Sequence, residues 1–275
     1  MSGRKKFTDY EYEGRRSGYR KKKRRGKKIR NLFVILFAVV LVFQIKNIVS
    51  EGTVPQLAFL TDGKARQVME NADQYPADLV EIVKNNPETA EFVLDYPEKK
   101  DQAPADTVGE LTGGIPLLLQ WDERWGYTIY GDNYLAVNGC GPTAVAMVAA
   151  GLTGDNTITP CKVARYAAEQ GYYTGESGTS WDLMTSGVQR FGIYGEEMGL
   201  SESEVMAALE SGCPIICSMR PGDFTTTGHF IVLTGVENGK IRVNDPNSRI
   251  RSERLWDYDT LEWQISNLWV YSLLY

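Results

Sequence analysis

The sequence predicts an α+β fold for residues 113–275, with helices in the first half and antiparallel strands in the second. Segments whose apolar residues recur with a helical period precede Gly212, and shorter runs rich in Val, Ile and Leu follow it. Between two of these runs, Asn238-Gly239 is typical of a tight turn that joins antiparallel strands. Helices first and antiparallel strands after is the order of an α+β domain.

Local signals define the individual elements. Thr159-Pro160 opens one helix, since proline suits a first helical position, and Ser201 with Glu204 is expected to form a capping box for another. In chain order we expect a strand at residues 115–120, helices at 142–152, 160–169, 179–191 and 201–209, strands at 214–219, 229–236 and 240–244, a short helix near 259–265 and a strand at 269–274.

Charge is distributed unevenly along the 275 residues, whose net charge is −5. Residues 1–30 hold 14 Lys and Arg against three acids, which leaves 16 basic and 32 acidic residues in the remainder. Such a basic tail can bind nucleic acid. Its position directly before an apolar run favours instead a role in membrane topology, with contact to anionic lipid. We therefore predict a cytoplasmic tail at residues 1–30 and no nucleic-acid partner.

The apolar run at residues 31–49 predicts a transmembrane signal-anchor helix. The eighteen residues 32–49 would extend about 27 Å as a helix, just enough to cross the hydrocarbon layer. A cleaved signal peptide is the alternative, but the basic region is long and no Ala-x-Ala-like site follows. We expect a single-pass protein of the cell membrane with its N-terminus in the cytoplasm and its acidic remainder outside.

Residues 50–112 are expected to form a partly helical stalk or linker. Residues 77–85 and 87–94 are typical of short amphipathic helices, and their apolar side chains indicate that the segment packs against something. The polar stretch at 98–114, which ends in glycines, is the best candidate for a linker to the domain at 113–275.

The chain has four cysteines, Cys140, Cys161, Cys213 and Cys217, which do not describe a disulfide scaffold. Cys213 and Cys217 lie four residues apart in an expected strand, about 13 Å from each other, and this separation forbids a direct bridge. Buried thiols that act as small apolar residues are the default for Cys161, Cys213 and Cys217. Pairing of Cys161 with either of the other two stays open.

Cys140 is the candidate nucleophile. It lies between Gly139 and Gly141, just ahead of the expected helix at 142–152. A helix N-terminus and a neighbouring histidine lower a thiol pKa from about 8.5 to as low as about 3.5, which produces the reactive thiolate. The two glycines are expected to leave room for a substrate backbone beside the sulfur. His229 is the only histidine of the chain, so any chemistry that depends on an imidazole must use it.

Asp245 and Gln120 complete the candidate set. Asp245 ends the second strand of the expected hairpin, where it can accept the Nδ1 proton of His229 and fix the tautomer that a base needs. Asn247 is a weaker candidate for this role. Gln120 can donate, together with the backbone N–H of Cys140, to a developing oxyanion, which contributes about 3 kcal/mol in comparable sites. Each residue alone has an ordinary structural explanation. Their joint occurrence indicates a thiol hydrolase.

Five sequence blocks resemble the stand-alone relatives of the bacteriocin-processing, double-glycine cysteine peptidases, the peptidase C39-like family. The blocks occur in the same order over residues 113–275 and are Gln120-Trp121-Asp122-Glu123-Arg124-Trp125, Gly139-Cys140-Gly141-Pro142-Thr143-Ala144-Val145-Ala146-Met147, Gly178-Thr179-Ser180-Trp181, Gly228-His229-Phe230 and Asn244-Asp245-Pro246. The resemblance implies a papain-like fold, with Cys140 as nucleophile, His229 as base, Asp245 as its orienting partner and Gln120 as oxyanion donor. It implies a peptide or protein substrate and no cofactor or metal.

The sequence departs from that family in two respects. Twenty residues separate Gln120 from Cys140, whereas in the transporter-fused peptidases the glutamine precedes the cysteine by only a few residues. The chain also has no nucleotide-binding cassette or Walker motif, so it is not expected to be an exporter that cleaves leader peptides.

Three functions compete at this point. The leading hypothesis is a membrane-anchored, outward-facing cysteine peptidase that works through a thioester acyl-enzyme. A cell-wall amidase or endopeptidase is the second, although an Asp-Cys-Ser motif is absent and the acidic outer part would be repelled by an anionic wall. The third is a binding module that has lost its activity. The presence of all four candidate residues argues against it. The specific substrate and the oligomeric state stay open.

Overall fold

A computed structural model of the chain describes residues 62–175 and 178–275. These residues belong to one compact unit, Pro55–Tyr275. The basic tail predicted at 1–30 and the transmembrane helix predicted at 31–49 lie outside the described residues. Within the described part, no helix combines the length and apolar character that a bilayer crossing requires.

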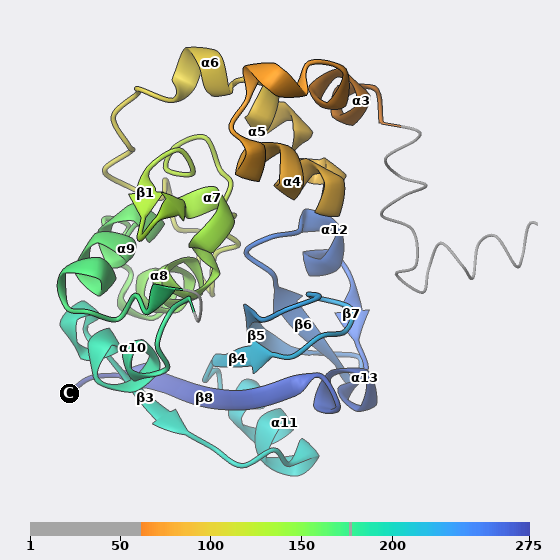
Figure 1. Ribbon diagram of the computed structural model, residues 1–275. Helices are drawn as coiled ribbons and strands as arrows, with labels where there is room; N and C mark the ends of the chain where they lie inside the picture. The colour runs from red at the N-terminus through yellow and green to blue at the C-terminus, as the bar shows by residue number, and fades with distance from the viewer. Residues whose placement is uncertain (1–61, 176–177) are drawn as a thin grey trace, which may run out of the picture. The chain divides into compact units, whose positions relative to one another are not determined.

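A six-stranded antiparallel sheet forms the centre of the described unit, which confirms the predicted α+β class (Figure 1). The strands lie in the order β3-β8-β4-β5-β6-β7. Their bounds are β3 Ile193–Glu197, β4 Ile215–Met219, β5 His229–Glu237, β6 Lys240–Asn244, β7 Leu255–Trp256 and β8 Ile265–Leu273. The turn between β5 and β6 is the predicted one, because Asn238 and Gly239 have φ values of 53° and 75°, as this type of hairpin requires.

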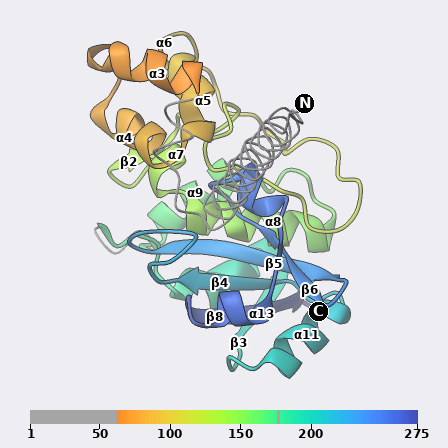
Figure 2. The same ribbon diagram turned by 90° about the vertical axis from the view of Figure 1, so that its right-hand side faces the viewer.

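The two faces of the sheet bury separate hydrophobic cores. Ile216 of β4 packs toward the cluster around helix α8, whereas its neighbours Ile215 and Cys217 pack toward the cluster around α11 and α13. This alternation follows from the two-residue period of a strand. Figure 2 shows α8 on one side of the sheet and α11 on the other. The helices are α8 Cys140–Thr153, α9 Pro160–Glu169, α10 Asp182–Thr185, α11 Glu202–Glu210, α12 Arg249–Ser252 and α13 Tyr258–Glu262.

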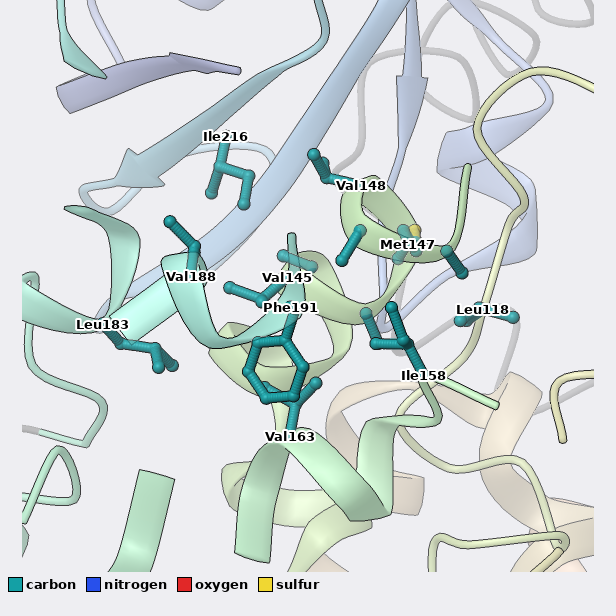
Figure 3. Packing of buried hydrophobic residues seen from close by; sticks show 14 of the residues in the cluster. Leu118, Val145, Met147, Val148, Ile158, Val163, Leu183, Val188, Phe191 and Ile216 are labelled. Carbon is teal, nitrogen blue, oxygen red and sulfur yellow. The ribbon is translucent and has the colours of Figure 1, made fainter. Parts of the chain in front are cut away.

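Helix α8 is buried along most of its length. Every residue from Gly141 to Ala150 is buried, which is expected for a helix that is apolar all round. Its alanines, glycines and short side chains let the sheet and α9 approach closely, and Val145, Met147 and Val148 are among the residues that fill the space between them (Figure 3). This packing fixes the N-terminal end of α8, where Cys140 lies.

The segment before residue 100 is helical and shares a core with the rest of the unit. Its elements are α3 Gly63–Glu70, η1 Ala72–Gln74, α4 Ala77–Asn85, η2 Pro87–Thr89, α5 Ala90–Leu94 and α6 Tyr96–Lys99. Its apolar side chains pack against four buried residues that come later in the chain, namely Leu119, Trp121, Tyr127 and Ala136. Between this segment and α8 lie a short hairpin, β1 Ile129–Tyr130 and β2 Asn133–Tyr134, and the single turn α7 Leu135–Asn138.

Three local expectations were wrong. Residues 115–120 form no strand. Leu118 and Leu119 point to opposite sides and are buried in two different hydrophobic cores. Both side chains are therefore buried although this segment pairs with no strand. The helix expected at 179–191 is divided into α10 and the 3-10 helix η4 Gly187–Phe191. The capping box of α11 is absent, since the side chain of Ser201 makes no capping hydrogen bond.

Candidate active site

Cys140 is the first residue of α8 and is partly exposed. The expectation that its flanking glycines leave room for substrate was wrong, because both are needed for close packing. A Cβ at Gly139 would lie 2.3 Å from the carbonyl oxygen of Leu135, and one at Gly141 would lie 2.7 Å from Oγ1 of Thr179. The absence of side chains at the two glycines thus allows the turn that carries Cys140 to pack closely against Leu135 and Thr179.

His229 and Asp245 lie side by side. His229 opens β5 opposite Met219 of β4, and Asp245 follows directly after the end of β6. Nε2 of His229 lies 2.7 Å from Oδ1 of Asp245. The predicted partner was Nδ1, so the ring is oriented the other way. Because Asp245 engages Nε2, Nδ1 is the ring nitrogen that remains to interact with the thiol of Cys140, and His229 and Cys140 shift each other's pKa.

Asp245 is fully buried and is held by more groups than the sequence indicated. Its Oδ2 accepts a hydrogen bond from Nε of Arg251 at 2.5 Å. Its Oδ1 also accepts the backbone N–H of Asn247 at 2.7 Å, and its own N–H donates to Oγ of Ser252 at 2.8 Å. A buried carboxylate needs this density of donors to stay ionised. Arg251 carried no signal in the sequence beyond its charge, since it lies six residues past Asp245 in a short basic stretch.

These contacts set the charges of the site. Burial opposes the charged form of each group. For Cys140, the hydrogen bond and charge of His229, together with the backbone amides of Phe230 and Gly141, outweigh burial and lower the pKa. Asp245 and then Cys140 raise the pKa of His229 in spite of its burial. The charges of His229 and Arg251 lower the pKa of Asp245. The arrangement therefore favours a thiolate–imidazolium pair.

Gln120 is buried between the two halves of the site. Its backbone N–H donates to the carbonyl of Pro246 at 2.8 Å, which places it beside the Asp245 loop. Its side-chain Nε2 donates to the carbonyls of Ala136 and Val137, at 2.8 and 3.2 Å, just before the Cys140 turn. Both amide hydrogens are thus directed at backbone, and Oε1 is buried without a partner. This geometry differs from the expected one, in which the amide faces an oxyanion.

The remaining cysteines have different surroundings. All four are free thiols, so none of the pairings left open by the sequence is present. Burial strongly raises the pKa of Cys217, which lies in β4 with apolar neighbours. Cys213 was expected in the same strand as Cys217, but it precedes β4. Among the described residues, no cluster of three or more His, Cys, Asp and Glu side chains could hold a metal ion.

Comparison with known proteins agrees with the resemblance seen in the sequence. The profile of the Peptidase_C39 like family matches residues 112–272, more than half of the chain. The chain belongs to this family. The part that matches contains all four candidate residues, whereas the helices from α3 to α6 precede it. Members of the Peptidase_C39 like family are related to cysteine peptidases, so membership indicates activity of this class.

Two solved structures are similar to the chain at low identity. The chain is similar to the peptidase domain of Streptococcus ComA, a bi-functional ABC transporter involved in quorum sensing, with 17% identity, a TM-score of 0.37 and coverage of 50% of this chain and 93% of that one. It is also similar to a double-glycine-motif protease from an AMS/PCAT transporter in complex with its leader peptide, with 14% identity, a TM-score of 0.38 and coverage of 59% and 95%. No curated protein matches the chain significantly.

Proposed function

We propose that this member of the Peptidase_C39 like family is an active cysteine peptidase with Cys140 as nucleophile, His229 as acid and base, and Asp245 as orienting residue. The observation that carries the proposal is the continuous contact of these three side chains. Cys140 lies close enough to His229 for the imidazole to lower the pKa of its thiol, and Nε2 of the same ring lies 2.7 Å from Oδ1 of the buried Asp245. A purely structural histidine needs no thiol on one side and no ionised carboxylate on the other.

The reaction follows from this geometry. The Cys140 thiolate attacks the carbonyl carbon of the peptide bond, and the resulting oxyanion forms near the first amides of α8, which have no intrahelical partner. Nδ1–H of His229 protonates the leaving amine, the C–N bond breaks and a thioester remains. Nδ1 then removes a proton from water, which attacks the thioester. The C–S bond breaks, the carboxylic acid is released, and the Cys140 thiolate leaves beside the His229 imidazolium, which restores the starting pair. Asp245 stabilises the imidazolium in both steps.

Gln120 is proposed to act in the site in one of two roles, either as a structural link or as an oxyanion donor. As arranged here, its amide fixes the turn before Cys140 to the loop that follows Asp245. The oxyanion role expected from the sequence requires the amide to leave the carbonyls of Ala136 and Val137 when substrate binds. The first role follows directly from the contacts and is the one we favour.

We further propose that the peptidase is anchored in the cell membrane by residues 31–49 and acts outside the cell. The asymmetry between the basic tail and the acidic remainder supports this topology. Protease added to intact cells should digest the part beyond residue 51 and spare a tag placed before residue 32. If the part of the chain beyond residue 51 stays undigested inside the cell, this location is contradicted.

The activity is tested by incubating the full-length chain with a mixed peptide library and identifying new termini by mass spectrometry. We expect the wild type and the control variant Cys213→Ala to generate products and Cys140→Ala to generate none, because Cys213 is also a partly buried thiol but has no histidine beside it. Equal product from the wild type and Cys140→Ala would contradict the proposal.

A further inference from the structure

The segment that precedes the family-matched region is in direct contact with the loop that holds Asp245. This segment comprises residues 62–100, whereas the family match begins at residue 112. Its contacts with the loop come from η2 and the residue just before it, at the end of α4. Figure 1 shows α12, which belongs to the loop, next to α4.

Glu88 of η2 makes the main contact. One carboxylate oxygen, Oε1, accepts the hydroxyl of Ser248. The other, Oε2, accepts the backbone N–H groups of Arg249 and Ile250 at 2.8 and 3.3 Å. These amides begin α12 and have no partner inside that helix. A carboxylate that satisfies them is a strong, charge-assisted cap, although it comes from a residue 160 positions away in the chain.

The first turn of α12 also holds Asp245 in place. Oγ of Ser248 accepts the backbone N–H of Arg251 at 3.1 Å, and Arg251 donates its Nε to Oδ2 of Asp245. Ser252 donates its hydroxyl to the carbonyl of Ser248 at 2.7 Å and accepts the backbone N–H of Asp245 at 2.8 Å. Glu88 is therefore two hydrogen bonds away from the groups that fix the position of Asp245.

Asn86 makes a second contact with the same loop. Its Nδ2 donates to the carbonyl of Asn247 at 2.5 Å, and Nε1 of Trp121 donates to the same carbonyl at 3.0 Å. The N–H of Asn247 bonds Oδ1 of Asp245, the oxygen that faces His229. The loop is thus held by the N-terminal segment both before and within α12.

We propose that residues 62–100 are a positioning element of the peptidase and that Glu88 is its principal positioning residue. The inference rests on the proposed function, because the groups it positions are Asp245 and, through it, His229. Glu88 touches neither substrate nor the reacting atoms. Without its carboxylate the first two amides of α12 and the Ser248 hydroxyl lose their acceptor. Asp245 is then held less firmly against His229, and the imidazolium that stabilises the Cys140 thiolate is itself less stabilised.

The test uses the full-length chain and measures iodoacetamide alkylation of Cys140 from pH 5 to 9 by mass spectrometry, at a temperature where every variant is folded. For Glu88→Ala we expect the midpoint of the alkylation profile to move to higher pH and the rate at pH 6 to fall about threefold to tenfold, since one pKa unit changes the thiolate fraction tenfold. Glu88→Gln should show a smaller change, because its side-chain oxygen can still accept the Ser248 hydroxyl.

Glu91→Ala is the matched control. Glu91 lies three residues further along the same segment and pairs with Lys64 at the surface, so its loss should leave the alkylation profile unchanged. An unchanged profile in Glu88→Ala, or an equal change in Glu91→Ala, would overturn the inference. If Glu88→Ala does not fold, an unchanged profile in Glu88→Gln overturns it. A wild-type Cys140 that reacts no faster than Cys213 would overturn the proposed function itself.

Discussion

Two thiols on opposite faces of the same sheet have opposite electrostatic surroundings. Cys140 lies at the start of α8 with His229 and two backbone amides around its sulfur, and its pKa is lowered. Cys217 lies in β4 among apolar side chains, and burial raises its pKa. Burial penalises the thiolate in both places. The difference shows that the donors and charges next to the sulfur determine the direction in which each thiol pKa is shifted.

The largest effect on this comparison is expected from removing the imidazole. His229→Ala should abolish hydrolysis, a loss on the order of 10⁴-fold or more, because it removes the acid, the base and the stabilising charge together. Cys140 alkylation near neutral pH should also slow toward the rate of an ordinary thiol. Steady-state kinetics and mass-spectrometric labelling measure the two effects. Full peptidase activity in this variant would rule out the proposed catalytic group.

A smaller effect is expected from Asp245→Asn. The amide keeps the size of the side chain but removes the charge that stabilises the imidazolium, so activity should fall by roughly 10²- to 10⁴-fold without disappearing. Arg251 is left with a partly buried, unpaired charge, and the free energy of unfolding should fall by about 3 kcal/mol or more. Denaturant unfolding checks the second expectation. Unchanged stability would show that the Arg251–Asp245 contact is not formed.

The smallest effect on turnover is expected from Gln120→Ala. Its amide hydrogens bond the carbonyls of Ala136 and Val137, so the main cost should be about 1–3 kcal/mol of unfolding free energy, with a decrease of kcat below about tenfold. Chemical denaturation and kinetics on one preparation separate the two quantities. A kcat about 10²-fold lower with unchanged KM and unchanged stability would instead show that Gln120 donates to the oxyanion.

The sequence predicted those parts of the fold and site that depend on local patterns. The small-residue run after Cys140 indicated α8, and Asn238-Gly239 indicated the hairpin that brings the start of β5 near the end of β6. Because a hairpin sets its two strands side by side, the sequence alone was enough to place His229 near Asp245. Both signals lie within a few residues of the feature that they predict.

The features that the sequence did not predict depend on contacts between distant segments. The ring of His229 presents Nε2 and not Nδ1 to Asp245, and the spacing of the two residues in the sequence does not determine this orientation. The amide of Gln120 bonds carbonyls sixteen and seventeen residues away. The contact of Glu88 with the Asp245 loop joins parts of the chain that share no motif.

The most direct test is brief iodoacetamide labelling of the folded chain, with all four cysteines mapped by mass spectrometry across a range of pH. Because the pKa of Cys140 is lowered, its thiolate should persist as the pH falls below the range of ordinary thiols. Because the pKa of His229 is raised to about 9, the imidazolium partner should persist until the pH rises through that value. We predict that Cys140 labels far faster than Cys161, Cys213 and Cys217 at pH 6. Equal labelling of the four would contradict the proposed catalytic role of Cys140.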